Sequence, residues 1–492
     1  MVQFSFAADS PTKVKADVLV LPVFQGPTPG PGVREAGLDR TYAASKLKGK
    51  RGENLLVPRR SGDKFASGAV LLVGVGDRKE FDVAALRRSL GRVAGSLARF
   101  GSVATAFPLA LDSNPDAVQA AAEALALGSY RFERYKTKKP EAKGFSKIIV
   151  LGGDAKSGRA AVRRGSIVAD AVRWARDLVN TPAGDMPPAE IAREAQQMAN
   201  EVGLRCKVWS EAELKRGGFG GILGVGQGSV NPPRLIELEY RGAGNGRPIA
   251  LTGKGVAFDS GGLSIKDAKG METMKDDMGG AASILATMKA IARLKPKIDV
   301  IAAIPSSENM PSGSATKPGD VLTHRGGKTS EVLNTDAEGR LILADALAYL
   351  AEQKPQVIID TATLTGACMV ALGDEISGAF GNDDGVVEDL RAAGDAVGEP
   401  YWQMPLWKGY RKQIDSPIAD VKNIGNRYGG AITAALFLSE FVGDTPWVHL
   451  DIAGTAFSEN GNDLGPKGAT GVPVRSLVRY VLDRADEAAA TT

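Results

Sequence analysis

One short segment sets two carboxylates and a guanidinium at alternate positions: Asn334-Thr335-Asp336-Ala337-Glu338-Gly339-Arg340-Leu341. In an extended backbone, residues two apart point to the same side, so we expect Asp336, Glu338 and Arg340 to converge there. Two hard anionic oxygen ligands suit a divalent metal ion, and a guanidinium beside them suits an anion held near that metal. The structural alternative is a surface cluster of ion pairs, which contributes little to stability.

A lysine and an aspartate interrupt a second segment that is otherwise apolar and rich in glycine, residues 253–262. Lys254 and Asp259 are unusual in such surroundings, and the glycines on both sides of Lys254 allow a ligand to approach closely. A buried Lys254–Asp259 pair is the structural alternative.

A third group of charges, which includes Asp276 and Asp277, immediately precedes a predicted helix at 279–294. Aspartates at this place can simply cap the helix and oppose its dipole, and for Asp277 the ligand role and the capping role stay equally open. Lys266 lies in the loop between the second and third segments.

The charges of these segments match two divalent cations. Four carboxylates supply the negative charge: Asp259, Asp277, Asp336 and Glu338. Lys266 and Arg340 then leave a positive excess, which suits a bound hydroxide and a developing oxyanion. A lysine that loses its proton to the metal can also be a nitrogen ligand, which makes Lys254 a candidate. The residues alone therefore predict a hydrolase with two metal ions.

Other types of hydrolytic site need residues that this chain does not provide. The chain has only two histidines, His324 and His449, which excludes histidine-rich zinc sites and the H-E-x-x-H type. No G-x-S-x-G segment frames a nucleophilic serine. Cys368 lies in a run of small and apolar residues, which is typical of a buried, unreactive thiol.

The elements that must position these residues alternate between strand and helix. In the first 150 residues we predict strands at 18–23, 69–75 and 147–151 and helices at 84–100 and 116–130. After a long helix, and a further one at 187–202, strands are predicted at 235–240, 249–253, 300–304, 357–360 and 447–452, with helices at 279–294, 341–352 and 431–442.

This pattern predicts an α/β fold. We expect a smaller N-terminal α/β domain with a mixed sheet at 1–157, a linking helix at 158–180, and a larger C-terminal α/β catalytic domain at 181–492. The central sheet of the larger domain should be covered by helices on both faces. The charged segments sit at predicted strand ends, where active sites of such sheets lie.

Composition points to an ordinary globular protein in the cytoplasm. The chain has 492 residues, of which 43% are hydrophobic and 24% charged. No stretch is long and apolar enough for a membrane span, and the N-terminus does not resemble a signal peptide. Two cysteines, Cys206 and Cys368, give no disulfide framework.

Charge is unevenly distributed along the chain. Residues 1–150 contain 24 Lys and Arg against 14 Asp and Glu, a balance of +10, whereas the remainder has a balance of −6. The basic part includes the segment 131–139. It indicates either a solvated lysine-rich loop, which we favour, or a surface for nucleic acid.

The motif at 334–341 resembles the signature of the leucine aminopeptidase family, also called the cytosol or leucyl aminopeptidase family, in its bacterial type. Three earlier segments match that family in order and spacing: G-K-G-x-x-F-D-S-G-G at 253–262, S-I-K at 264–266 and M-K-x-D-M-x-G-A at 274–281. The resemblance covers most of residues 170–492 and is weaker in the first 160.

The resemblance implies a role for each residue. Asp259 and Glu338 would contact both metal ions, Lys254 and Asp277 would complete one metal site, and Asp336 the other. Lys266 would polarise the scissile carbonyl, and Arg340 would hold a bicarbonate that acts as general base. The substrate pocket would include Met274, Thr363 and Leu364.

The activity implied is that of a metal-dependent aminopeptidase that removes N-terminal leucine or another apolar residue from peptides. Two divalent ions per subunit, Mn²⁺ or Zn²⁺, would be the cofactors, with bicarbonate. The family's usual assembly is a homohexamer with enclosed active sites. Some bacterial members also bind DNA, so a regulatory role of the basic N-terminal domain is the alternative, and no membrane partner is expected.

Overall fold

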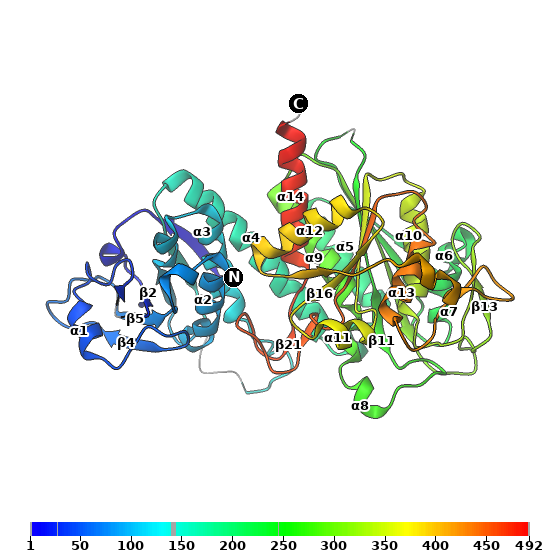
Figure 1. The fold of residues 1–492 in the computed structure, drawn as a ribbon, viewed down its shortest axis with the longest axis horizontal. Helices are drawn as coiled ribbons and strands as arrows, with labels where there is room; N and C mark the ends of the chain where they lie inside the picture. The colour runs from blue at the N-terminus through cyan, green and yellow to red at the C-terminus, as the bar shows by residue number, and fades with distance from the viewer. Residues whose placement is uncertain (1, 27, 139–143, 245, 491–492) are drawn as a thin grey trace. The chain divides into compact units, whose positions relative to one another are not determined.

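The computed structural model describes residues 2–26, 28–138, 144–244 and 246–490. Lys139, the last residue of the basic segment, lies outside the described residues. The chain forms two compact units, a smaller one of Met1–Arg173 with Glu459–Lys467 and a larger one of Trp174–Ser458 with Gly468–Thr492 (Figure 1). The long helix α4 (Ala155–Asn180) contributes residues to both units.

A mixed sheet forms the centre of the smaller unit. Its strands run in the order β1-β7-β6-β2-β5-β4, with β3 beside β2, and only β3 and β4 are antiparallel to their neighbours. The strands are β1 (Gln3–Ala7), β2 (Val18–Phe24), β3 (Thr28–Pro29), β4 (Asn54–Pro58), β5 (Ala69–Gly74), β6 (Ser102–Thr105) and β7 (Lys147–Leu151).

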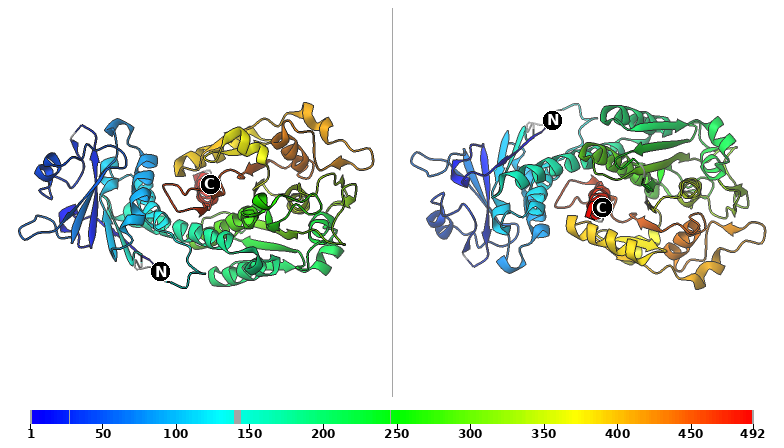
Figure 2. Two further views of the ribbon diagram at one scale, coloured as in Figure 1. Left: turned by 90° about the horizontal axis from the view of Figure 1, so that it is seen from below. Right: turned by 90° about the horizontal axis from the view of Figure 1, so that it is seen from above.

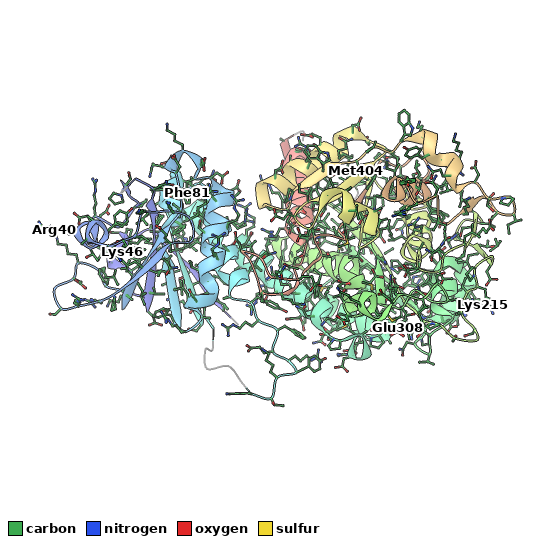
Figure 3. All side chains as sticks on the ribbon, turned by 60° about the horizontal axis from the view of Figure 1, so that its bottom comes forward. Arg40, Lys46, Phe81, Lys215, Glu308 and Met404 are labelled. Atoms are coloured by element: carbon green, nitrogen blue, oxygen red, sulfur yellow. The ribbon has the colours of Figure 1, made fainter. Side chains whose placement is uncertain are left out.

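Two helices pack closely together in the smaller unit, α2 (Val83–Leu97) and α3 (Pro115–Gly128), and a short helix α1 (Asp39–Ala44) follows β3. The two pack closely at glycines, because a Cβ added at Gly128 would lie 2.2 Å from the carbonyl oxygen of Gly91. In the core, the ring of Phe81 meets those of Phe24 and Phe107 edge-on, at centroid distances of 5.4 and 6.2 Å (Figure 3).

The larger unit is built on a second mixed sheet in the order β17-β16-β19-β15-β10-β12-β9-β8, with β11 beside β12. Its centre, β19-β15-β10-β12, is parallel. The strands are β8 (Arg205–Trp209), β9 (Arg234–Tyr240), β10 (Ile249–Gly253), β11 (Gly255–Asp259), β12 (Val300–Asn309), β15 (Val357–Ala362), β16 (Ser377–Gly381), β17 (Tyr401–Gln403) and β19 (Trp447–Asp451).

Helices cover both faces of this sheet (Figure 2). One face packs against α5 (Pro188–Val202) and α9 (Gly279–Leu294), with α14 (Val474–Ala490) packed on α9, and the other against α7 (Gly220–Gly226) and α10 (Gly339–Ala351), with α13 (Gly430–Ser439) packed on α10. Ala250 and Ile358 belong to the apolar cluster that includes α10, whereas the alternate residues Leu251 and Ile359 are buried toward the opposite face. The predicted fold class is therefore confirmed.

Shorter elements complete the larger unit. They are α6 (Glu211–Gly217), α8 (Ala268–Met271), the 3₁₀ helix η5 (Met274–Met278), α11 (Gly366–Leu372), α12 (Asp384–Val397), the small sheet of β13 (Val321–Thr323), β14 (Thr329–Glu331) and β18 (Val421–Lys422), and the pair β20 (Phe457–Ser458) and β21 (Gly468–Ala469). Within the described ranges, no helix is both long and apolar enough to cross a membrane.

Candidate active site

The charged residues singled out in the sequence meet at one end of the larger unit's parallel strands. Lys254 directly follows β10, Asp259 ends β11 and Thr363 directly follows β15. Asp277 lies on η5, immediately before α9, and Glu338 immediately precedes α10.

Two lysines bridge the carboxylates in pairs. Lys254 Nζ lies 2.7 Å from Asp277 Oδ1 and 2.7 Å from Glu338 Oε1, and it donates to the carbonyl oxygen of Thr363 at 3.0 Å. Lys266 Nζ lies 2.6 Å from Asp336 Oδ1 and 2.9 Å from Asp259 Oδ2. The structural alternative of a Lys254–Asp259 pair is therefore not what forms, since Asp259 pairs with Lys266.

The carboxylates have the arrangement expected of metal ligands. Asp259, Asp336 and Glu338 each offer an oxygen within 4.8 Å of the others. Asp277 Oδ2 and Glu338 Oε2 are buried, and among the described residues they find no hydrogen-bond donor. Burying a carboxylate oxygen without a donor costs free energy unless a cation is bound. These residues therefore fit divalent metal ions.

Burial has the largest effect on the pKa values of the charged groups in this cluster. Burial raises the pKa of Asp277, Glu338 and Asp336, and for Glu338 the charge of Asp259 raises the pKa further. Burial alone would lower the pKa of Lys254 and Lys266, but the surrounding carboxylates raise it above the ordinary value. The cluster thus holds its negative charge at a cost that bound cations would relieve.

The extended backbone predicted for 334–341 is wrong. Residues 334–338 form a turn and a loop, and α10 begins at Gly339, so Arg340 lies on a helix. Side chains bend the segment: Thr335 Oγ1 donates to the carbonyl oxygen of Gly261 at 2.6 Å, and Asp336 N donates to Asn334 Oδ1 at 2.9 Å. Asp336 and Glu338 still converge, but through a loop.

Capping does not explain Asp277. Met278 is the N-cap of α9, and no side chain caps it. Asp277 instead pairs with Lys254 and accepts a hydrogen bond from Thr363 Oγ1 at 2.8 Å.

Arg340 lies in the first turn of α10 and is 7% exposed. Its Nη1 donates to the carbonyl oxygen of Asn423 at 2.7 Å, and its buried Nε lacks an acceptor in the part of the chain that the structure describes. Burial lowers the pKa of Arg340 to about 10, against the opposing charges of Glu338 and Asp451. A buried guanidinium with unused donors is suited to hold an anion.

The three residues predicted for the substrate pocket differ in their contacts. Thr363 touches the cluster directly, through Asp277 and Lys254. Leu364 is half-buried against the apolar cluster of α10, and its N–H donates to Asp451 Oδ1 at 3.3 Å. Met274 begins η5, the turn that carries Asp277, and is half-buried.

Sequence reasoning missed two buried asparagines that organise the loops. Asn309 Nδ2 donates to Asp259 Oδ1 and to the carbonyl oxygen of Thr335, both at 2.8 Å. The side chain of Asn423 also forms hydrogen bonds with the main chain of the 333–337 loop. Their positions in the sequence indicated little about this role: each is a polar residue at or just after the end of a strand.

Space around Lys254 depends on a glycine. A Cβ at Gly339 would lie 2.6 Å from Lys254 Cε and 2.9 Å from its Nζ. The motif therefore needs glycine here to leave room for the ammonium group.

Comparison with known proteins assigns the family. The profile of the "Cytosol aminopeptidase family, catalytic domain" matches residues 173–478, and that of its N-terminal domain matches residues 20–139. A "Probable cytosol aminopeptidase" of Syntrophotalea carbinolica is 45% identical, covering 94% of this chain and 96% of the relative. One of Streptomyces coelicolor is 44% identical and covers 95% of each.

Two solved structures are similar over nearly the whole length. A mutant of tomato leucine aminopeptidase superposes with a TM-score of 0.87 at 31% identity, covering 98% of this chain and 97% of the other. The bottromycin maturation enzyme BotP in complex with Mn superposes with a TM-score of 0.85 at 34% identity, covering 96% and 100%. The chain therefore belongs to the cytosol aminopeptidase family and is a metal-dependent aminopeptidase.

Proposed function

We propose that this enzyme removes an N-terminal residue, preferably leucine or another apolar one, from short peptides, with two divalent metal ions, Mn²⁺ or Zn²⁺, per subunit. The observation that carries the proposal is the buried carboxylate cluster around Lys254. In it, one oxygen of Asp277 and one of Glu338 receive no hydrogen bond from any described residue. The structural relative that was solved with Mn supports the choice of ion.

Five side chains would hold the metals: Asp259 and Glu338 toward both ions, Lys254 and Asp277 toward one, and Asp336 toward the other. When bound, the ions lower the pKa of water and polarise a carbonyl. Lys266 Nζ lies 2.9 Å from Asp259 Oδ2 and 2.6 Å from Asp336 Oδ1, at the edge of the carboxylate cluster, so its ammonium would donate to the carbonyl oxygen and stabilise the developing oxyanion.

Arg340 would bind a bicarbonate whose oxygen accepts the proton of the attacking water. Each histidine instead pairs with an aspartate outside the proposed ligand set. His324 donates or accepts only within a buried group with Asp345 and Ser330, and His449 pairs with Asp360, both histidines being at most 1% exposed. Met274, Thr363 and Leu364 would line the pocket for the apolar side chain.

We further propose a cytoplasmic homohexamer, with the functional division of the chain at 1–157, 158–180 and 181–492. Light scattering during gel filtration tests the assembly. A mass of one subunit at working concentration would contradict it.

The DNA-binding alternative rests on the +10 balance of residues 1–150. Arg40 and Lys46 are exposed basic side chains of that part (Figure 3). Duplex DNA binding that weakens steeply with salt, and exceeds binding to heparin, would support the added role. Equal, weak binding to both polyanions would remove it.

Hydrolysis of leucine p-nitroanilide by chelated protein, resupplied with Mn²⁺, Zn²⁺, Mg²⁺ or Co²⁺, tests the main proposal. We expect activity to disappear on chelation and return with metal. N-acetyl-leucine p-nitroanilide is the matched control, since blocking the amine should abolish cleavage. Metal-independent cleavage, or equal cleavage of both substrates, would overturn the proposal.

A further inference from the structure

Asn423 directly follows β18 and is completely buried. Both the NH₂ group and the oxygen of its side-chain amide form hydrogen bonds with the main chain of the 333–337 loop. Nδ2 donates to the carbonyl oxygens of Asn334 at 2.6 Å and Ala337 at 3.3 Å, and Oδ1 accepts from the N–H groups of Leu333 at 2.9 Å and Asn334 at 3.3 Å. Because the loop offers donors and acceptors together, a carboxylate of the same size cannot replace this amide.

The main chain of the same residue reaches the guanidinium. The carbonyl oxygen of Asn423 accepts from Arg340 Nη1 at 2.7 Å, and the N–H of Asn423 donates to the carbonyl oxygen of Glu331 at 2.9 Å. One residue therefore bonds to the loop that carries Asp336 and to the side chain of Arg340.

We propose that Asn423 is a positioning residue, which holds Arg340 and the Asp336 loop in fixed register with each other. The inference rests on the proposed function, in which Arg340 holds the anion and Asp336 is a metal ligand. Misplacing reacting groups by about 1 Å costs on the order of 10²-fold in rate.

The loop has a second anchor, which makes a test possible. Asn309 holds the carbonyl oxygen of Thr335, and Thr335 Oγ1 holds that of Gly261. Removing the Asn423 side chain therefore loosens the loop without releasing it, so the variant should fold and bind metal.

The experiment compares Asn423→Ala and Asn423→Asp with the control Asn426→Ala. Asn426 is the same residue type in the same segment, but it is exposed: its N–H donates to Gln413 Oε1, and its Oδ1 accepts from the N–H of Tyr428. Turnover of leucine p-nitroanilide, metal stoichiometry by mass spectrometry, and the bicarbonate concentration for half-maximal activation are measured on each protein.

For both Asn423 variants we expect two metals per subunit, a KM within about threefold of the wild type, and a kcat about 10²-fold lower. The half-activating bicarbonate concentration should rise about tenfold, as expected for a loosened anion site. Asn426→Ala should match the wild type. In an Arg340→Ala background, Asn423→Ala should lower kcat by about tenfold or less, because its effect through Arg340 is already lost and only its effect on the Asp336 loop remains.

An unchanged bicarbonate response, or kcat losses that simply multiply in the double variant, would overturn the proposal. Failure of both Asn423 variants to fold would overturn it too, in favour of a purely structural role. An inactive wild type would instead refute the proposed function, whereas an active wild type with normal Asn423 variants refutes only this inference.

Discussion

The larger unit contains two buried polar groups whose residue types both look hydrolytic. One is the cluster of Lys254, Asp277 and Glu338. The other joins Ser330, His324 and Asp345: His324 Nε2 lies 2.7 Å from Ser330 Oγ, and its Nδ1 lies 3.2 Å from Asp345 Oδ1.

The two groups differ in whether their buried carboxylate oxygens receive hydrogen bonds. Asp345 Oδ1 also accepts from the N–H of Arg325 at 2.9 Å, and Oδ2 from that of Ile222 at 2.8 Å, so the serine–histidine–aspartate group is complete within the fold. Glu338 Oε2 and Asp277 Oδ2 accept nothing from any described residue. A satisfied group stabilises the protein, whereas an unsatisfied buried carboxylate marks a binding site.

The largest expected effect follows from Glu338, the carboxylate at the start of α10. Glu338→Ala should lower kcat for leucine p-nitroanilide by about 10³-fold or more, because a shared metal ligand is lost, while the circular dichroism spectrum stays unchanged. Glu352→Ala, at the opposite end of the same helix, is the control. Unchanged turnover after Glu338→Ala would refute the assignment of this cluster.

Arg340→Ala should cost less, about 10²-fold in kcat, because the anion is lost but the metal ligands remain. Stimulation by bicarbonate in carbonate-depleted buffer should disappear with it. If the variant responds to bicarbonate as the wild type does, the anion is held elsewhere.

Asp345→Asn should act on stability and not on catalysis. An amide NH₂ would face the N–H of Ile222 or Arg325, so the free energy of unfolding should fall by about 1–3 kcal/mol. Urea denaturation measures this, and kcat per folded molecule should stay within about twofold. A large loss of kcat at normal stability would mean that the serine–histidine–aspartate group is catalytic.

The smallest effect concerns pH and the second histidine. Burial would lower the pKa of His449, but the charge of Asp360, whose Oδ1 lies 2.5 Å from Nδ1, raises it above the ordinary value. The stabilisation from charged His449 is therefore fully present below about pH 6.5 and lost as pH rises through the raised pKa. His449→Gln should lower the unfolding free energy more at pH 6 than at pH 9. A difference that grows toward pH 9 would contradict the sign.

The sequence predicted the fold class because strand and helix periodicities are local. Predicted helices at 279–294 and 341–352 correspond to α9 and α10, and the strands at 249–253 and 147–151 to β10 and β7. Asn309 and Asn423 could not be found in this way. The partners of their side chains lie 26 to 90 residues away in the chain, so only the folded loops reveal them.

The alternation of Asp336, Glu338 and Arg340 shows a different limit. The residue types were informative, but the backbone that presents them is a loop leading into a helix and not a strand. Side-chain bonds from Thr335 and Asn334 override the extended geometry that the spacing suggested.

Gly339 gives the site an unusual sensitivity. A single added methyl group there would lie 2.6 Å from Lys254 Cδ and Cε and 2.9 Å from its Nζ, which is too close for the side chain to stay in place. The lysine would have to withdraw from Asp277 and Glu338, and their negative charges would then repel each other without it. An alanine at this position, although small and uncharged, would therefore disturb the site through the position of Lys254.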